Sequence, residues 1–422
     1  MSLAGIVLLV ALALLGLPLF VVLGAGGLLG AWAADLDPAV LVVEVHRLAS
    51  SPNLVAIPLF TLAGTVLAAG GAPQRMVRLF NAGLGWLPGG LAVVTVASCA
   101  FFTAFAGASG ITILALGGLL YPILVSGRYT ERFALGLITA SGSLGLLFAP
   151  SLAVLLYGIV SGVAIEDLFW AGAVPGFILL VMLGAYSAYM GRRTGIPKRT
   201  FAFEELLAAV RQGFWDLLLP VGILVGIFGG FVTITEAAAC TAGYVLFMEL
   251  AVHRTLPLDR SLLYVFKDAA VLVGSILIIL SLAMGLTNLL VDAQLPMKVL
   301  ASLERGLDSQ LQFLLLLNLF LLAVGAIMDI FSATIVIVPL ILPVALRFGV
   351  DPVHLGILFL ANLEIGYCTP PVGINLFISS QRLRQPVLAC FRATLPFLAI
   401  MLVWLVVVTY VPFVSLWWRA LP

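Results

Sequence analysis

The chain has 422 residues, of which 63% are hydrophobic and only 9% are charged, and its mean hydropathy is +1.23. Soluble domains carry about 25% charged residues, so the composition excludes a soluble globular protein. The 20 basic and 19 acidic residues nearly cancel, so the charge gives no case for nucleic-acid binding. Apolar runs of about 20 residues recur along the chain, and they predict an all-α, polytopic membrane protein.

The first predicted span covers residues 5–32, and the second covers residues 54–69. Residues 1–23 lack the basic segment of a secretion signal, so we expect them to belong to the first span. A charged, amphipathic connection at 35–51 separates the two spans. Arg75 and Arg78 follow the second span and mark a further connection.

A long apolar stretch at 88–127 is divided by the sequence Ala106-Gly-Ala-Ser-Gly110. The two arms have about 17 and 15 residues, and a helix needs about 20 to cross a bilayer. We therefore predict a re-entrant helical hairpin with its tip at residues 107–110.

The following helix, predicted at 133–160, contains several residues that interrupt helices, among them Gly145 and Pro150. We expect it to be a broken helix. A span at 168–190 follows, and then the most basic loop of the chain, with Arg192, Arg193, Lys198, Arg199 and Arg211. Residues 201–214 overlap this loop and predict an amphipathic helix at the membrane surface.

The second half begins with predicted spans at 215–232, 236–252 and 269–291. Thr235 is the expected N-cap of the second of these, with Glu236 in its first turn. A charged connection at 292–308 leads to another divided apolar stretch at 313–346, which has Asp329 near its midpoint. This stretch predicts a second hairpin.

The most informative segment lies in a second broken helix, predicted at 354–380, which precedes a last span at 387–417. Pro370 and Pro371 remove two backbone donors and move Thr369 out of the helical region. Unwound backbone at membrane depth is tolerated only where protein buries it or where it lines a polar cavity. A proline kink in a packed helix is the alternative interpretation.

The two halves resemble each other at a constant offset of 221 residues, and they divide the chain into repeats at 1–200 and 215–422. The matched pairs are Pro122 and Pro343, Ala140 and Ala361, Gly145 and Gly366, Pro150 and Pro371, and Pro175 and Pro396. If the basic loops are cytoplasmic, the amino terminus lies inside and the two hairpins open to opposite sides. This arrangement is an inverted repeat, which is typical of secondary transporters.

An inverted repeat predicts that substrate and ion sites lie where the hairpin tips meet the broken helices. Backbone donors at a hairpin tip suit an anionic substrate, and the candidate substrate residues are Gly107, Ser109, Gly110 and Asn375. Unwound carbonyls and hydroxyls suit sodium, and the candidate ion ligands are Ser141, Ser143, Asp329, Gly366, Thr369, Pro370 and Gly373.

Simpler interpretations remain open for several of these residues. Asp329 would serve equally well as a hydrogen-bonded cap of the hairpin, and the serines as small residues that let helices pack closely. Glu364 is a secondary candidate, for pairing with a basic group or for capping. The four cysteines lack metal-ligand spacing, and the three histidines lie in or beside predicted connections, which argues against a proton relay.

Taken together, these motifs resemble the large membrane subunit of tripartite ATP-independent periplasmic (TRAP) transporters. The resemblance covers essentially the whole chain and rests on Ile57-Pro-Leu-Phe60 with Gly64, Gly85-Trp-Leu-Pro-Gly-Gly-Leu91, Thr233-Ile-Thr-Glu-Ala237, Asp329, Asn362-Leu-Glu-Ile-Gly366 and Thr369-Pro-Pro-Val-Gly-Ile-Asn-Leu-Phe377. The first hairpin tip departs from the family's usual Ser-Gly-Ser-Ala. Ala149-Pro150 departs from its usual Pro-Pro.

The resemblance implies an elevator-type, sodium-coupled importer of carboxylate-bearing solutes, such as C4-dicarboxylates, in the bacterial inner membrane. It also implies three kinds of partner besides the solute and membrane lipid: sodium as coupling ion, a small TRAP membrane subunit, and a periplasmic substrate-binding protein. A self-sufficient sodium/dicarboxylate symporter with the same two-hairpin plan is the alternative.

Two further classes fit the sequence less well. An intramembrane hydrolase needs a paired nucleophile and base or a metal cluster, and Asp329 among hydroxyls is not such a pair. A channel does not require two opposed hairpins with broken helices.

Overall fold

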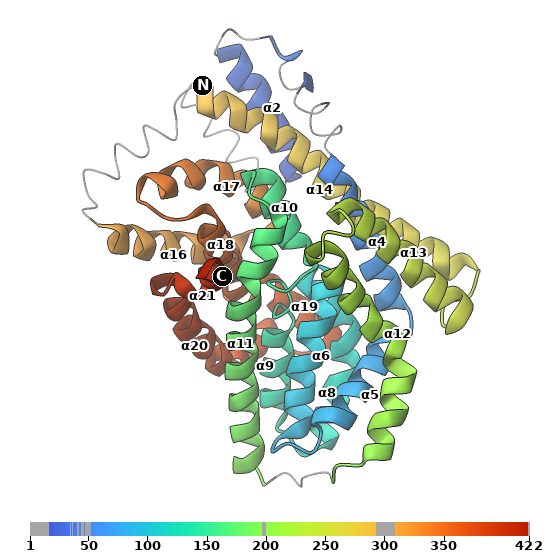
Figure 1. Ribbon diagram of the computed structural model, residues 1–422. Coiled ribbons are helices and arrows are strands. Elements are labelled where there is room, and N and C mark those ends of the chain that lie inside the picture. The colour runs from blue at the N-terminus through green and yellow to red at the C-terminus, as the bar shows by residue number, and fades with distance from the viewer. Residues whose placement is uncertain are drawn as a thin grey trace.

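The computed structural model describes residues 17–33, 35, 37–39, 42–43, 46, 52–195, 200–292 and 309–420. The described residues form helices and connecting turns without a β-strand (Figure 1). Several predicted features lie outside them: residues 5–16 of the first span, most of the connection at 35–51, Lys198 and Arg199, and the connection at 293–308.

The first half contains α2 (Leu19–Ala33), η1 (Pro52–Val55), α4 (Ala56–Ala69), α5 (Ala72–Leu84), α6 (Gly90–Ala106), α7 (Ser109–Thr112), η2 (Ile113–Gly117), α8 (Gly118–Ser126), α9 (Glu131–Ser141), α10 (Leu152–Ser161) and α11 (Ile165–Arg193). The second half contains α12 (Phe203–Phe228), α13 (Ile234–Phe247), η3 (Met248–Val252), α14 (Arg260–Asp292), α16 (Gln310–Ile327), α17 (Ile330–Arg347), α18 (Pro352–Gly366), α19 (Ile374–Leu383), α20 (Val387–Tyr410), α21 (Phe413–Leu416) and η4 (Trp417–Ala420).

Within the described ranges, 8 helices are long and apolar enough to cross a membrane. One of them is the continuous 18-residue helix formed by α7, η2 and α8. The helices α4 and α5 are bent by 73° at Gly70 and Gly71, and together they form one further candidate span. The length and apolar composition of these helices agree with the predicted polytopic membrane protein.

The element boundaries repeat with the 221-residue offset that the prolines and glycines indicated. The helix α6 ends at Ala106 and α16 ends at Ile327, while α7 begins at Ser109 and α17 at Ile330. The broken helices begin at Glu131 in α9 and at Pro352 in α18. The peptide bonds that precede Pro150 and Pro371 are both cis.

In each half, the first arm of the divided stretch packs against the broken helix through a close backbone contact. A Cβ atom at Gly366 would lie 2.4 Å from the carbonyl carbon of Gly325 in α16. A Cβ atom at Gly145 would lie 2.4 Å from the backbone nitrogen of Ala104 in α6. Because both residues of one contact are 221 positions from those of the other, the same packing solution occurs twice.

The last long helices of the two halves, α11 and α20, meet in the protein interior. Trp404 is fully buried there, and its indole Nε1 donates a hydrogen bond to the carbonyl oxygen of Pro175 at 2.9 Å. The helices α9 and α20 also pack extensively against each other. The two halves therefore share one hydrophobic core rather than folding as separate domains.

The structure differs from the sequence prediction around Arg75, which was expected in a cytoplasmic connection. It lies in α5, with 7% of its surface exposed, and its Nε and Nη2 atoms bind Asp216 Oδ2 and Oδ1 in α12 at 2.6 and 2.8 Å. Arg75 Nη2 also binds Glu249 in η3, which accepts the Gly71 N–H at 3.2 Å. Arg75 is therefore a buried ion-pair residue within a helix rather than a residue of an exposed connection.

Two helix boundaries also differ. The predicted surface helix at 201–214 and the predicted span at 215–232 form one continuous helix, α12, because Gly213 alone does not terminate a helix. The N-cap of α13 is Thr233 rather than Thr235. Its hydroxyl accepts the Glu236 N–H at 3.3 Å, and Glu236 accepts the Thr233 N–H at 2.8 Å, which is a complete capping box.

Candidate functional site

A cavity of about 410 Å³ lies between the two hairpin tips, α14 and the break between α18 and α19. Its lining residues are Ala108, Ser109, Gly110, Ile111, Leu114, Leu146, Leu272, Ser275, Ile276, Ile279, Asp329, Ile330, Phe331, Ser332, Ile335, Tyr367, Ile374 and Ile378. The walls are mainly apolar. The polar groups come from the amino-terminal ends of helices, together with Ser275 and Tyr367.

The first hairpin tip turns at Gly107, which ends α6 with φ +67°. Only glycine adopts this left-handed conformation readily, and a Cβ atom here would also meet Leu152. Ala108 follows in an extended conformation and supplies no side-chain cap to the helix that starts at Ser109. The first N–H groups of this 18-residue helix therefore have no side-chain acceptor from the N-cap residue at the cavity.

The second hairpin tip has the same backbone plan but a different cap. Asp329 is the N-cap of α17, and its Oδ1 atom accepts the N–H groups of Phe331 and Ser332, each at 3.0 Å. A carboxylate at a helix amino terminus is stabilised by the helix dipole as well as by these bonds. The capping interpretation of Asp329 is therefore what the geometry shows, and the residue also lines the cavity.

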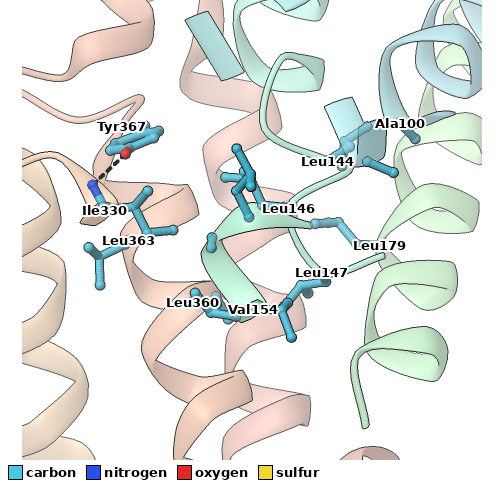
Figure 2. Close-up of a cluster of buried hydrophobic side chains, with 14 of the residues drawn as sticks. Ala100, Leu144, Leu146, Leu147, Val154, Leu179, Ile330, Leu360, Leu363 and Tyr367 are labelled. Atoms are coloured by element: carbon cyan, nitrogen blue, oxygen red, sulfur yellow. Dashed lines mark hydrogen bonds between the residues drawn. The ribbon is translucent and has the colours of Figure 1, made fainter. Parts of the chain in front are cut away.

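The break in the second broken helix is attached to the second tip by three hydrogen bonds. The Ile330 N–H donates to the Tyr367 hydroxyl at 2.5 Å, as Figure 2 shows. The N–H groups of Val372 and Gly373 both donate to the carbonyl oxygen of Ala326, at 3.0 and 3.1 Å. The end of α16, the start of α17 and the unwound segment 367–373 therefore form one hydrogen-bonded unit.

Thr369 and Pro370 lie within this unwound segment. The helix α18 ends at Gly366, three residues before Thr369, and α19 begins at Ile374, with Gly373 at φ +54°. The Thr369 hydroxyl donates to the Ile365 carbonyl at 3.0 Å. Two prolines at this point prevent the helix from continuing, as the sequence indicated.

The serines of the first broken helix are buried without hydrogen-bond partners. Ser141 ends α9, Ser143 lies in the turn that follows, and both have 0% exposure. Neither hydroxyl makes a hydrogen bond. Buried polar groups normally have a partner, so these hydroxyls leave oxygen ligands available to a hard cation such as sodium.

Not all the candidate residues reach the cavity. Ser109, Gly110 and Asp329 line it. The other eight candidates do not: Gly107, Ser141, Ser143, Gly366, Thr369, Pro370, Gly373 and Asn375. Asn375 is fully buried behind the cavity wall, and its Nδ2 atom donates to the Thr139 carbonyl at 3.3 Å. Asn375 therefore joins the second broken helix to the first.

Sequence reasoning missed Tyr367 and Ser275 as cavity residues, because nothing in their local pattern separates them from packing residues. Among the described residues, no group of three or more His, Cys, Asp or Glu side chains is arranged to hold a metal ion. The oxygens of hydroxyls, carbonyls and the Asp329 carboxylate are the ligands that this region offers.

Comparisons with known proteins agree on the kind of protein. The profile of the family described as "Tripartite ATP-independent periplasmic transporter, DctM component" matches residues 6–414. The C4-dicarboxylate TRAP transporter large permease protein of Vibrio cholerae is 33% identical, over 97% of this chain and 96% of that protein. The isethionate TRAP transporter permease protein of Oleidesulfovibrio alaskensis is 34% identical over 94% of this chain but 63% of its own length.

A structural neighbour supports the fold. The chain superposes on the YdaH transporter of Alcanivorax borkumensis with a TM-score of 0.62, covering 90% of this chain and 88% of the other. The two sequences are 15% identical, so this similarity concerns the fold alone.

Proposed function

Because the chain belongs to the DctM component family of the tripartite ATP-independent periplasmic transporters, we propose that it carries a carboxylate-bearing small solute across the membrane, with sodium as the coupling ion. The chain is a large permease subunit, a multi-pass protein of the inner membrane, and not an enzyme. The coupling ion, the solute class and the elevator movement are the parts that we propose.

One observation carries the proposed solute class: the contrast between the two helix amino termini at the cavity. The helix that starts at Ser109 has no side-chain cap, whereas Asp329 caps the helix that starts at Ile330. Free N–H groups at a helix amino terminus bind carboxylates and similar anions. We propose that the carboxylate of the solute accepts hydrogen bonds from backbone N–H groups at Ser109 and Gly110, while the apolar walls contact the rest of the molecule.

Sodium fits the oxygen-rich surroundings of the two broken helices. The residues proposed to hold it are Ser141 and Ser143 in the first half, and Asp329, Gly366, Thr369, Pro370 and Gly373 in the second. Bound sodium would supply positive charge beside the solute's carboxylate. The unpaired hydroxyls of Ser141 and Ser143 support this assignment, because they are buried where a cation would be their partner.

The proposed elevator movement rests on the repeated packing of hairpin on broken helix. The contacts Gly325–Gly366 and Ala104–Gly145 bring backbone against backbone, and such contacts leave little freedom for one element to slide on the other. Each hairpin would therefore move together with its broken helix, and the solute and ion sites would travel with them.

The name of the family indicates a transporter of three components, and the proposed partners are a small membrane subunit and a periplasmic solute-binding protein. The relative from Oleidesulfovibrio alaskensis extends beyond the match for more than a third of its length, as expected if a second membrane subunit is joined to it. Uptake by the purified chain alone, in lipid vesicles, would instead favour the self-sufficient symporter.

The ion assignment is tested by replacing Thr369 with alanine. We expect Thr369→Ala to raise the sodium concentration for half-maximal uptake by about tenfold, the equivalent of about 1.4 kcal/mol of binding free energy. Uptake of labelled solute should be measured in vesicles that contain all three components, with the sodium concentration varied.

A control is Thr241→Ala, because the Thr241 hydroxyl likewise donates to the carbonyl four residues before it, but lies in α13. Sodium dependence that is unchanged in Thr369→Ala would contradict the assignment of this residue. Uptake by the wild-type complex without any sodium would contradict sodium coupling altogether.

A further inference from the structure

Glu364 is a buried carboxyl group that has no basic partner among the described residues. It lies in the last turn of α18 with 0% exposure, and neither of its carboxyl oxygens makes a hydrogen bond. The Ser143 hydroxyl of the first broken helix, also fully buried, faces this carboxyl group and is the one described side chain placed to donate a hydrogen bond to it. Burial of an ionised carboxylate is costly unless a positive charge compensates it, and without such a charge the group takes up a proton.

Ser143 and Glu364 occupy equivalent positions in the two halves, since they are 221 residues apart. A neighbouring contact follows the same symmetry: the Cys368 thiol lies 3.6 Å from the Thr139 carbonyl oxygen. The counterparts of these two residues, Leu147 and Leu360, belong to the same buried cluster, drawn in Figure 2. The approximate twofold axis that relates the halves therefore passes between Ser143 and Glu364.

Two helices end at this axis, and both bring negative partial charge to it. The helix α9 ends at Ser141, and α18 ends at Gly366. The carbonyl groups in the last turn of a helix lack intrahelical partners and carry the negative end of the helix dipole. A carboxylate in this place is therefore disfavoured by its surroundings, and a cation is favoured.

No buried basic side chain in the described part of the chain compensates Glu364. Arg75 and His354 are the buried basic residues there. Arg75 is engaged with Asp216 and Glu249. His354 is ten residues from Glu364 in α18, about 15 Å along the helix axis, and its Nδ1 atom bonds Ser415 at 2.6 Å.

We propose that the Glu364 carboxylate and the Ser143 hydroxyl bind a sodium ion on the axis between the two halves. This inference rests on the proposed sodium coupling and adds to it a charged ligand, Glu364, that links the second broken helix to the first. Carbonyl groups at the ends of α9 and α18 complete an all-oxygen ligand set, as a hard cation requires. Because only one of the two equivalent positions is acidic, one ion neutralises the site.

The test is the thermal unfolding of the purified full-length chain in sodium chloride, compared with choline chloride at equal ionic strength. A bound ion raises the unfolding temperature according to its concentration and affinity. We expect Glu364→Gln to raise the sodium concentration for half-maximal stabilisation at least tenfold. In choline chloride the variant should be as stable as the wild type or more stable, because the uncompensated charge is gone.

If Glu364→Gln does not fold, a variant of Ser143 tests the same site. Ser143→Ala should raise the half-maximal sodium concentration several-fold, whereas Ser98→Ala, which removes another fully buried and unpaired hydroxyl, should leave it unchanged. If Glu364→Gln or Ser143→Ala responds to sodium as the wild type does, the sodium site at Glu364 is wrong, while the proposed sodium coupling still stands. A wild-type chain that sodium does not stabilise would also remove the sodium coupling on which the inference rests.

Discussion

The two hairpin tips have the same backbone break and opposite electrostatic character. Ala108 and Asp329 are equivalent residues, 221 positions apart, and each precedes the second arm of its hairpin. Asp329 bonds two N–H groups of its own helix, whereas Ala108 leaves the corresponding N–H groups without a side-chain acceptor. A single side chain therefore decides whether a tip is open to an external anion.

If the proposed solute site is at the first tip, this difference explains why the duplicated fold has one such site rather than two. The packing of hairpin on broken helix is the same in both halves, because it depends on small residues at matched positions. The chemistry at the tips is free to diverge, because it depends on one residue outside that contact. Variants that break the shared packing are expected to have larger effects than variants that change the residue at one tip.

The largest effect is expected from breaking the shared packing. Gly366→Ala places a Cβ atom 2.4 Å from the Gly325 carbonyl carbon, and Gly145→Ala places one 2.3 Å from the Ala100 carbonyl oxygen. Since backbone cannot move aside like a flexible side chain, each should lower the free energy of unfolding by about 3 kcal/mol. Thermal unfolding of the purified variants measures this. Gly243→Ala in α13, where nothing lies within 4 Å, is the control and should be neutral or stabilising.

The second effect concerns an attachment that only the second tip has. Tyr367→Phe removes the acceptor of the buried Ile330 N–H, and an unpaired buried donor costs about 1–3 kcal/mol. We expect a lower unfolding temperature and faster amide exchange at the start of α17. Unchanged exchange there, measured by mass spectrometry, would show that the bond does not hold the tip to the broken helix.

The third prediction concerns a variant in which the first tip has the acidic N-cap residue of the second. Ala108→Asp should cap the helix that starts at Ser109 and repel the solute's carboxylate, lowering uptake about tenfold, the equivalent of about 1.4 kcal/mol. Ala108→Asn caps without charge and separates the two causes. If uptake and assembly with the partners are normal in both variants, the first tip does not bind the solute.

The smallest effect is expected from removing the cap at the second tip. Asp329→Ala should lower the free energy of unfolding by about 1 kcal/mol, as the loss of an N-cap does. Asp329→Asn should retain that stability, because asparagine also caps. Comparing sodium-dependent uptake in the two variants then shows whether the charge of Asp329 has a role besides capping.

The sequence predicted the helix breaks because they depend on local chemistry. The prolines at 150, 370 and 371 restrict the backbone wherever the chain goes, and glycine at residue 107 permits the left-handed conformation that the turn requires. The 221-residue offset was visible for the same reason, since these residues are hard to replace. The family also followed from these motifs, and the profile match over residues 6–414 confirms it.

The remaining features depend on contacts between distant residues. Arg75 pairs with partners 141 and 174 residues away, so a local pattern of basic residues made it look like a loop marker. Ser143 and Glu364 are 221 residues apart, and they lie close together only because the axis that relates the two halves passes between them. The position of Asn375 behind the cavity wall likewise follows from its bond to Thr139, not from its place in the motif.

The buried bond between Trp404 and Pro175 has an optical consequence. All seven tryptophans lie in described residues, and Trp404 alone is fully enclosed by protein. Its fluorescence is therefore shielded from quenchers in water and in lipid for as long as α11 and α20 stay in contact. The difference between the fluorescence spectra of the wild type and a Trp404→Phe variant gives the Trp404 signal. This signal would report on the contact between α11 and α20 during transport without any added label.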